Sequence, residues 1–142
     1  MRYFLFSLCL LAAVFFSFQY IAQQKNAVVL IGQKVSYETQ VMETRQELAK
    51  GLMFVKEMPR NKGMLFDFHG YKNVAMWMKN TYTPLDMLFI DCTHKIVDMF
   101  ENAKPLSLDI IRPKGEVCYV LEINGGEIKA HDIHIGDSVT IK

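Results

Sequence analysis

The stretch Val74-Ala75-Met76-Trp77-Met78-Lys79 has an apolar side chain at every second position, with Trp77 and Lys79 on the alternate positions. A period of two residues is typical of a β-strand, whose successive side chains point to opposite faces. The short connection 80–84 then leads into a second apolar run, residues 85–91. This pattern predicts a β-hairpin, and a turn after residue 91 extends it into a meander.

Short strand-like runs continue on both sides of this hairpin. Thr44 and Glu47 have the spacing of a capping box, which predicts a helix of about two turns that ends at Gly51. We therefore predict a mainly β (α+β) fold, a β-sandwich or barrel-like domain with one or two short helices. The further strands are expected over residues 27–31, 34–41, 64–68, 96–101, 117–123 and 138–141, with a helical turn over 127–131.

The N-terminal segment differs from the rest of the chain. Residues 3–22 are almost wholly apolar and follow a single charge, Arg2. This is the pattern of an export signal, and it is long enough to cross a bilayer as one hydrophobic helix. Because Tyr20-Ile21-Ala22 is a poor cleavage site, we expect an uncleaved anchor, with a cleaved signal peptide as the alternative. We therefore divide the chain into three parts: a signal peptide or anchor over 1–22, a tether and first strand over 23–34, and the domain over 35–142.

The expected location follows from this segment. The domain is exported, and it is either membrane-anchored on the extracytoplasmic face or, after cleavage, periplasmic or secreted. Sixteen basic residues, one of them Arg2, nearly balance fifteen acidic residues. A neutral domain lacks the positive surface that nucleic acid requires, so we expect no nucleic-acid partner. The expected partners are the membrane, through residues 1–22, and an unknown small molecule or envelope protein.

Cys92 and Cys118 are the two cysteines beyond the apolar segment. In an exported domain two cysteines can form a disulfide. Each also adjoins strand-like apolar residues, where a small buried thiol is ordinary. Both alternatives stay open at this point.

Several sequence blocks occur in an order that is similar to a known family. The chain resembles the domain-of-unknown-function 192 family over roughly residues 35–141, with the cysteines and histidines outside the shared blocks. The resemblance implies a β-sandwich-like fold with small helical additions, often behind a signal or anchor, and no established substrate. The blocks are Gly51-Leu52-Met53, Gly63-Met64-Leu65-Phe66, Trp77-Met78-Lys79-Asn80-Thr81, Pro84-Leu85-Asp86, Val120-Leu121-Glu122 and Gly136-Asp137.

The block that starts at Trp77 carries the polar side chains of the candidate site. If Met76 and Met78 face the core, an indole and the Lys79 ammonium share the opposite face, where they suit a flat or anionic ligand. The structural alternative is that Lys79 pairs with a carboxylate and that Trp77 caps the core. We predict a binding or accessory domain that holds a small ligand or peptide through Trp77, Lys79, Asn80, Thr81, Asp86 and Glu122.

Two other functions compete with binding. Asp86 and Glu122 can be read as a general acid and base, which would make the protein an envelope hydrolase or lyase. Met76 and Met78 have a thioether spacing that suits Cu(I), although core packing explains methionines more simply. His131 and His134 we interpret as solvent-exposed rather than as a metal pair. We expect no cofactor or resident metal, and whether the domain is an enzyme stays open.

Overall fold

The computed structural model describes residues 25–69, 71 and 73–142. The predicted signal peptide or anchor, with its hydrophobic helix, lies outside these residues. Among the described residues, no helix has both the length and the apolar character needed to span a membrane.

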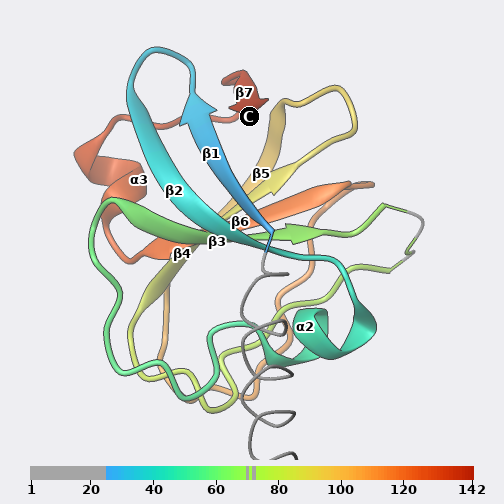
Figure 1. The fold of residues 1–142 in the computed structure, drawn as a ribbon, viewed down its shortest axis with the longest axis vertical. Helices are drawn as coiled ribbons and strands as arrows, with labels where there is room; N and C mark the ends of the chain where they lie inside the picture. The colour runs from blue at the N-terminus through green and yellow to red at the C-terminus, as the bar shows by residue number, and fades with distance from the viewer. Residues whose placement is uncertain (1–24, 70, 72) are drawn as a thin grey trace, which may run out of the picture.

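One sheet of seven strands forms the centre of the described domain and curves into a half-barrel (Figure 1). Its strand order is β5-β4-β6-β3-β2-β1-β7, so the three N-terminal strands lie together between β6 and β7 of the C-terminal half. The mainly β prediction is confirmed, with one curved sheet in place of a two-sheet sandwich. The strands are β1 (Asn26–Ile31), β2 (Val35–Met42), β3 (Lys62–Asp67), β4 (Leu85–Ile90), β5 (Ile96–Ala103), β6 (Tyr119–Asn124) and β7 (Val139–Ile141).

The pairing of the strands shows where the two edges of the sheet meet. Neighbouring strands are antiparallel, except that β2 and β3 are parallel. The two outer strands approach each other at one corner, where Lys95 and Ser138 form an isolated bridge. There Ile96 N donates to Asp137 O at 3.1 Å. This corner brings the two edges of the sheet together at one end.

Two short helices lie on different sides of the sheet in Figure 1, α2 (Arg45–Lys50) and α3 (Glu127–Ala130). The capping-box prediction for α2 is confirmed, because Glu47 N donates to Thr44 Oγ1 and Thr44 N donates to Glu47 Oε2. Gly51 ends the helix with φ 44°, and a Cβ there would lie 2.9 Å from the Phe66 ring. The helix is thereby held close to the sheet.

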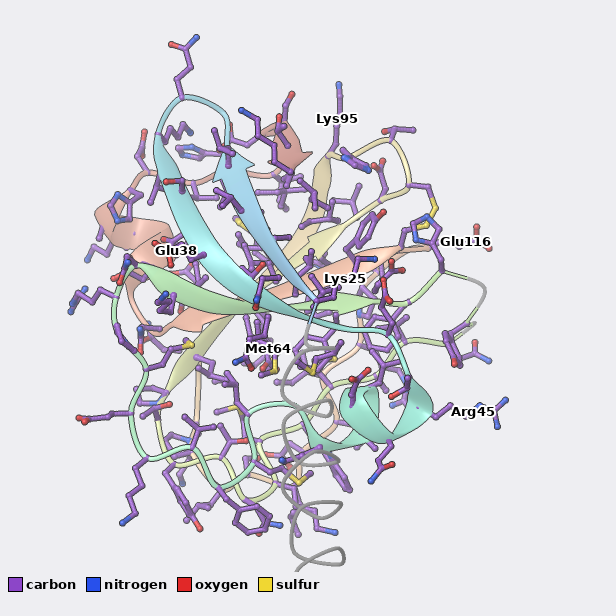
Figure 2. The ribbon with its side chains drawn as sticks, viewed as in Figure 1. Lys25, Glu38, Arg45, Met64, Lys95 and Glu116 are labelled. Atoms are coloured by element: carbon purple, nitrogen blue, oxygen red, sulfur yellow. A yellow bond between two sulfur atoms is a disulfide. The ribbon has the colours of Figure 1, made fainter. Side chains whose placement is uncertain are left out.

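The side chains of the sheet form two hydrophobic cores, one on each face. Along β4, Met87 belongs to one core and Leu88 to the other, as strand alternation requires. The first core, which contains Met64, also includes Met76 and Val117 from the long connections beyond the strands. Figure 2 labels Met64 close to the centre of the molecule. The second core lies against α3.

The predicted hairpin between residues 74–79 and 85–91 is wrong. Met76 instead pairs with Ile111 in the long loop, while β4 pairs with β5 and β6. The reason is that β4 is buried over its whole length and occupies the interior of the sheet. The segment 74–79 lies in the layer that covers the first core, where the loop supplies its hydrogen-bond partners.

Candidate functional site

A small cavity of about 240 Å³ lies between α2 and the segment that contains Trp77. Strand β6 contributes one polar side chain to the lining, α2 contributes its last turn, and residues 75–81 contribute the opposite wall. Leu52 and Phe66 add apolar surface. The polar or charged residues that line the cavity include Lys50, Trp77, Lys79, Thr81 and Glu122.

Glu122 is the buried polar group of this cavity. It lies in the middle of β6, where Met64 of β3 and Met87 of β4 pair with it on either side. The residue is 4% exposed. Among the residues that the structure describes, none donates a hydrogen bond to its carboxyl group, which keeps access to the cavity. Burial disfavours the charged form and raises the pKa of Glu122 from 4.5 to about 8, so the group is mainly protonated at neutral pH.

Trp77 and Lys79 form the outer rim of the cavity. Hydrogen bonds of 2.9 Å in both directions join Met76 to Ile111, and they hold the segment extended. Trp77 is consequently 40% exposed, whereas Met78 is buried. The Lys79 ammonium lies 4.9 Å from the centroid of the Trp77 ring, a cation–π contact. The predicted assignment of these side chains to two faces is confirmed, and within the described part of the chain Lys79 forms no ion pair with a carboxylate.

Asn80 and Thr81 form the turn that follows. Asn80 has φ 55°, and its carbonyl oxygen accepts from Phe54 N at 2.8 Å. Its side-chain nitrogen lies 3.9 Å from Met53 Sδ. Thr81 is buried, donates to Lys79 O at 3.3 Å and also lines the cavity. Asn80 therefore shapes the loop, whereas Thr81 combines a role in the turn with a hydroxyl at the cavity wall.

Asp86 has a different environment. It is fully buried, and its two carboxylate oxygens accept from Asn102 N at 2.8 Å and from Ile128 N at 2.9 Å. It shares a face of β4 with Leu88, which belongs to the second core. Glu122 shares a face of β6 with Val120, which belongs to the first core. The two carboxyl groups lie on opposite faces of the sheet, so the predicted acid–base pair is not formed.

The methionine pair is part of the hydrophobic core. Met76 and Met78 are both buried within the first core. Their thioethers therefore pack among apolar side chains. This arrangement matches the core-packing interpretation of the two methionines and not the Cu(I) site. The histidine pair does not converge either, because His131 contacts Glu127 at 3.2 Å whereas the His134 amide donates to Asp137.

Some site features were not predicted from the sequence. Lys50 at the end of α2 lines the same cavity as Lys79. The only feature of the sequence that pointed to Lys50 was the adjacent block Gly51-Leu52-Met53. The resemblance to the family includes this block but assigns it no role. Cys92 and Cys118 form a disulfide with a Cα–Cα distance of 5.1 Å, which selects one of the two alternatives left open by the sequence. Figure 2 draws this bond in yellow, near the labelled Glu116.

A larger hollow of about 670 Å³ lies over the β1–β2–β3 part of the sheet. None of the predicted site residues lines it. Its buried polar residue Thr39 donates to Ala27 O at 3.0 Å, and the Glu38 carboxylate pairs with Lys62. These groups already have partners within the protein, unlike Glu122.

The fold and the cavity define a curved, mainly β domain with a small polar pocket on one face of its sheet. The profile of the family DUF192, described as an uncharacterized ACR, matches residues 27–141. The chain therefore belongs to the DUF192 family. Comparison with curated proteins found no match.

The solved structures that are similar to this chain include the following three. A candidate transcription regulator from Sinorhizobium meliloti 1021 is 39% identical, with a TM-score of 0.77 over 82% of this chain and 92% of that one. A protein of unknown function from Novosphingobium aromaticivorans DSM 12444 is 31% identical, with a TM-score of 0.75 over 82% and 84%. A hypothetical protein from Synechocystis is 7% identical, with a TM-score of 0.51 over 82% and 18%, and shares the fold alone.

Proposed function

We propose that the domain binds a small polar ligand in the cavity beside Glu122, with an anionic group of the ligand at the cavity mouth. The observation that carries this proposal is the Glu122 carboxyl, which is buried, lines the cavity and accepts no hydrogen bond from the described residues. Buried polar groups nearly always have a partner. No side-chain oxygen or nitrogen of the described residues is both fully buried and unbonded, so the Glu122 carboxyl meets the open volume of the cavity. A ligand in that volume can bond to the carboxyl directly.

The protonation state of Glu122 restricts the ligand. With a pKa raised to about 8, the carboxyl is mainly neutral at pH 7 and offers one O–H donor and one carbonyl acceptor. Such a group matches a hydroxyl or an amide, each of which both donates and accepts. We therefore expect the buried end of the ligand to be polar and uncharged.

The mouth of the cavity favours negative charge. Lys50 and Lys79 are both exposed lining residues. Trp77 adds a partly exposed aromatic surface next to Lys79. Two cations and an indole suit a carboxylate-bearing ring. A volume of about 240 Å³ lies just below the usual range for drug-sized ligands, so one sugar ring or an acylated amino acid is the expected size.

Binding is favoured over catalysis and over nucleic-acid recognition. Glu122 is the one carboxylic acid among the described lining residues, whereas glycoside hydrolysis by acid and base requires two. The helices of the described chain have six and four residues, and the overall charge is close to zero. These features give no reason to assign to this chain the regulatory role that the description of the Sinorhizobium protein names.

We also propose that the domain works outside the cytoplasm, behind the apolar segment 3–22. The Cys92–Cys118 disulfide supports this location, because disulfides persist mainly in oxidising compartments. A fractionation experiment with accessibility to added protease tests it. Recovery of the whole protein with the cytosol would overturn it.

A thermal-shift screen tests the binding proposal. The purified protein is screened against uronic acids, neutral sugars, N-acyl amino acids and simple amines, because a ligand that binds the native state raises the melting temperature. We expect stabilisation by the anionic, hydroxyl- or amide-bearing compounds. The stabilisation should disappear in Glu122→Leu and in Trp77→Ala, and persist in the surface control His134→Ala. Stabilisation by amines alone, or equal stabilisation of all variants, would contradict the proposal.

A further inference from the structure

A cluster of potential metal ligands lies at the shared end of β3, β4 and β6. His69 follows β3, Cys92 follows β4, and Cys118 precedes β6. Ligand atoms of these three residues all lie within 4.8 Å of one another. None of the three lines the Glu122 cavity. Strand register produces the cluster, because Tyr119 of β6 pairs with both Asp67 and Ile90.

His69 is held in an orientation that is typical of a metal ligand. Its Nδ1 lies 2.7 Å from Asp67 Oδ1, and its backbone N–H donates to the same oxygen at 3.0 Å. Its ring packs nearly perpendicular to the Tyr119 ring, with 4.8 Å between the ring centroids. A carboxylate on one ring nitrogen fixes the tautomer and leaves the other nitrogen, Nε2, to bind a cation.

The two cysteines differ in accessibility. Cys92 is exposed, whereas Cys118 is buried. In the disulfide neither sulfur is a thiolate, so the cluster has one strong ligand, His69. Reduction of the disulfide would provide two thiolates next to an imidazole, a ligand set that favours Zn²⁺ and other thiophilic cations.

We propose that reduction of the Cys92–Cys118 disulfide converts this cluster into a site for a thiophilic divalent cation, bound by Cys92 Sγ, Cys118 Sγ and His69 Nε2. Tetrahedral zinc places such atoms about 3.3–3.8 Å apart. The two sulfurs, which are bonded to each other in the disulfide, separate on reduction, and the imidazole, which lies within 4.8 Å of them, moves closer. The fourth position faces solvent, because Cys92 and His69 are exposed.

The redox step requires an external dithiol as reductant. One thiolate of the dithiol attacks the exposed Sγ of Cys92, the S–S bond breaks, and Cys118 leaves as a thiolate. The second thiol of the dithiol then attacks the mixed disulfide and releases Cys92. The reductant leaves as its own disulfide, and both cysteines are reduced. When the cation binds, the two cysteine thiols release two protons.

Zn²⁺ titration of the reduced protein tests the proposal. The full-length protein is reduced with dithiothreitol, the dithiol is removed under anaerobic conditions, and Zn²⁺ is titrated against a chromophoric chelator. We expect one equivalent to bind to the reduced protein and none to the oxidised protein at this cluster. Affinity should fall at least tenfold in His69→Ala and about 10–100-fold in Asp67→Asn, and be unchanged in His134→Ala.

A second readout guards against loss of the fold after reduction. Co²⁺ in place of Zn²⁺ should give the charge-transfer absorption of thiolate ligands, and circular dichroism should retain the β-sheet signal. Equal zinc affinity in His69→Ala and wild type would overturn the proposal, as would an absence of thiolate-to-cobalt absorption. A reduced protein that loses its sheet and does not regain it with Zn²⁺ would overturn it too.

Discussion

Asp86 and Glu122 lie on opposite faces of one sheet, although Glu122 pairs directly with Met87, the residue after Asp86. One step along a strand reverses the direction of a side chain. The two buried carboxyl groups consequently have unrelated roles. Asp86 accepts two backbone hydrogen bonds within the protein, whereas Glu122 faces a cavity without such a partner.

Replacement of Asp86 should destabilise the fold without a direct effect on the cavity. Asp86→Ala leaves the buried amide of Ile128 without an acceptor, at a cost of about 1–3 kcal/mol, and also removes the part-buried hydrogen bond to the Asn102 amide. Asp86→Asn keeps one acceptor oxygen and should have an intermediate effect. Urea unfolding followed by circular dichroism measures both. A free energy of unfolding equal to that of wild type in Asp86→Ala would refute this role.

Glu122 should give the protein a characteristic pH dependence. Its pKa is 4.5 in the unfolded chain and about 8 in the folded protein, so between these values the folded state keeps a proton that the unfolded state has lost. The free energy of unfolding therefore falls as the pH rises through this window, with a slope that approaches about 1.4 kcal/mol per pH unit. Glu122→Gln removes the titrating group and should flatten the curve between pH 5 and 8.

Unfolding by urea at a series of pH values measures this difference. Glu47 and Asp137 have lowered pKa values because hydrogen bonds stabilise their charged forms. Their contributions disappear as the pH falls below about 4.5, outside the window that reports on Glu122. Parallel pH profiles for wild type and Glu122→Gln would show that Glu122 is already ionised in the folded state.

The capping box at Thr44 should support the wall of the cavity. Thr44→Ala removes the acceptor of the Glu47 amide and should lower the free energy of unfolding by about 1 kcal/mol. Because Leu48 to Lys50 line the cavity, fraying of α2 should also weaken the binding of any ligand found in the screen. Gln46→Ala, in the same helix, is the control. Thermal unfolding should place Thr44→Ala clearly below Gln46→Ala; equal melting temperatures would contradict the role of the cap.

Two glycines provide a matched pair for the packing of the sheet. A Cβ at Gly63 would lie 2.8 Å from the backbone oxygen of Glu122, whereas a Cβ at Gly115 would have no atom within 4 Å. Gly63→Ala should therefore cost about 1–3 kcal/mol, because the neighbouring strand must move. Gly115→Ala should be neutral or slightly stabilising. Equal unfolding midpoints for the two variants would contradict the close approach of β3 and β6.

Local structure was predictable from the sequence to a large extent. Alternation predicted that Trp77 and Met78 lie on opposite faces, and the spacing of Thr44 and Glu47 predicted where α2 begins. Both patterns depend only on near neighbours in the chain. Strand partners depend on distant residues. The pairing of Met76 with Ile111 had no local signal, and hence the predicted hairpin was wrong.

The candidate site shows the same limit. Alternation within β4 and β6 fixes which residues share a face of each strand, but it does not relate the faces of two strands. The pairing of Met87 with Glu122 is what places Asp86 and Glu122 on opposite faces of the sheet. The register of Ile90 with Tyr119 likewise brings Cys92 and Cys118 together. Both relationships come from long-range pairing and could not be read from spacing.

The most direct test of the binding proposal is calorimetric titration of the best stabilising compound into wild type and Glu122→Leu at pH 7. Wild type should bind one equivalent. The variant should bind about 5- to 140-fold more weakly, since loss of one buried hydrogen-bonding group costs about 1–3 kcal/mol and about 1.4 kcal/mol corresponds to a factor of ten. Equal affinity in the two proteins would show that the ligand does not reach Glu122 and would contradict the proposed site.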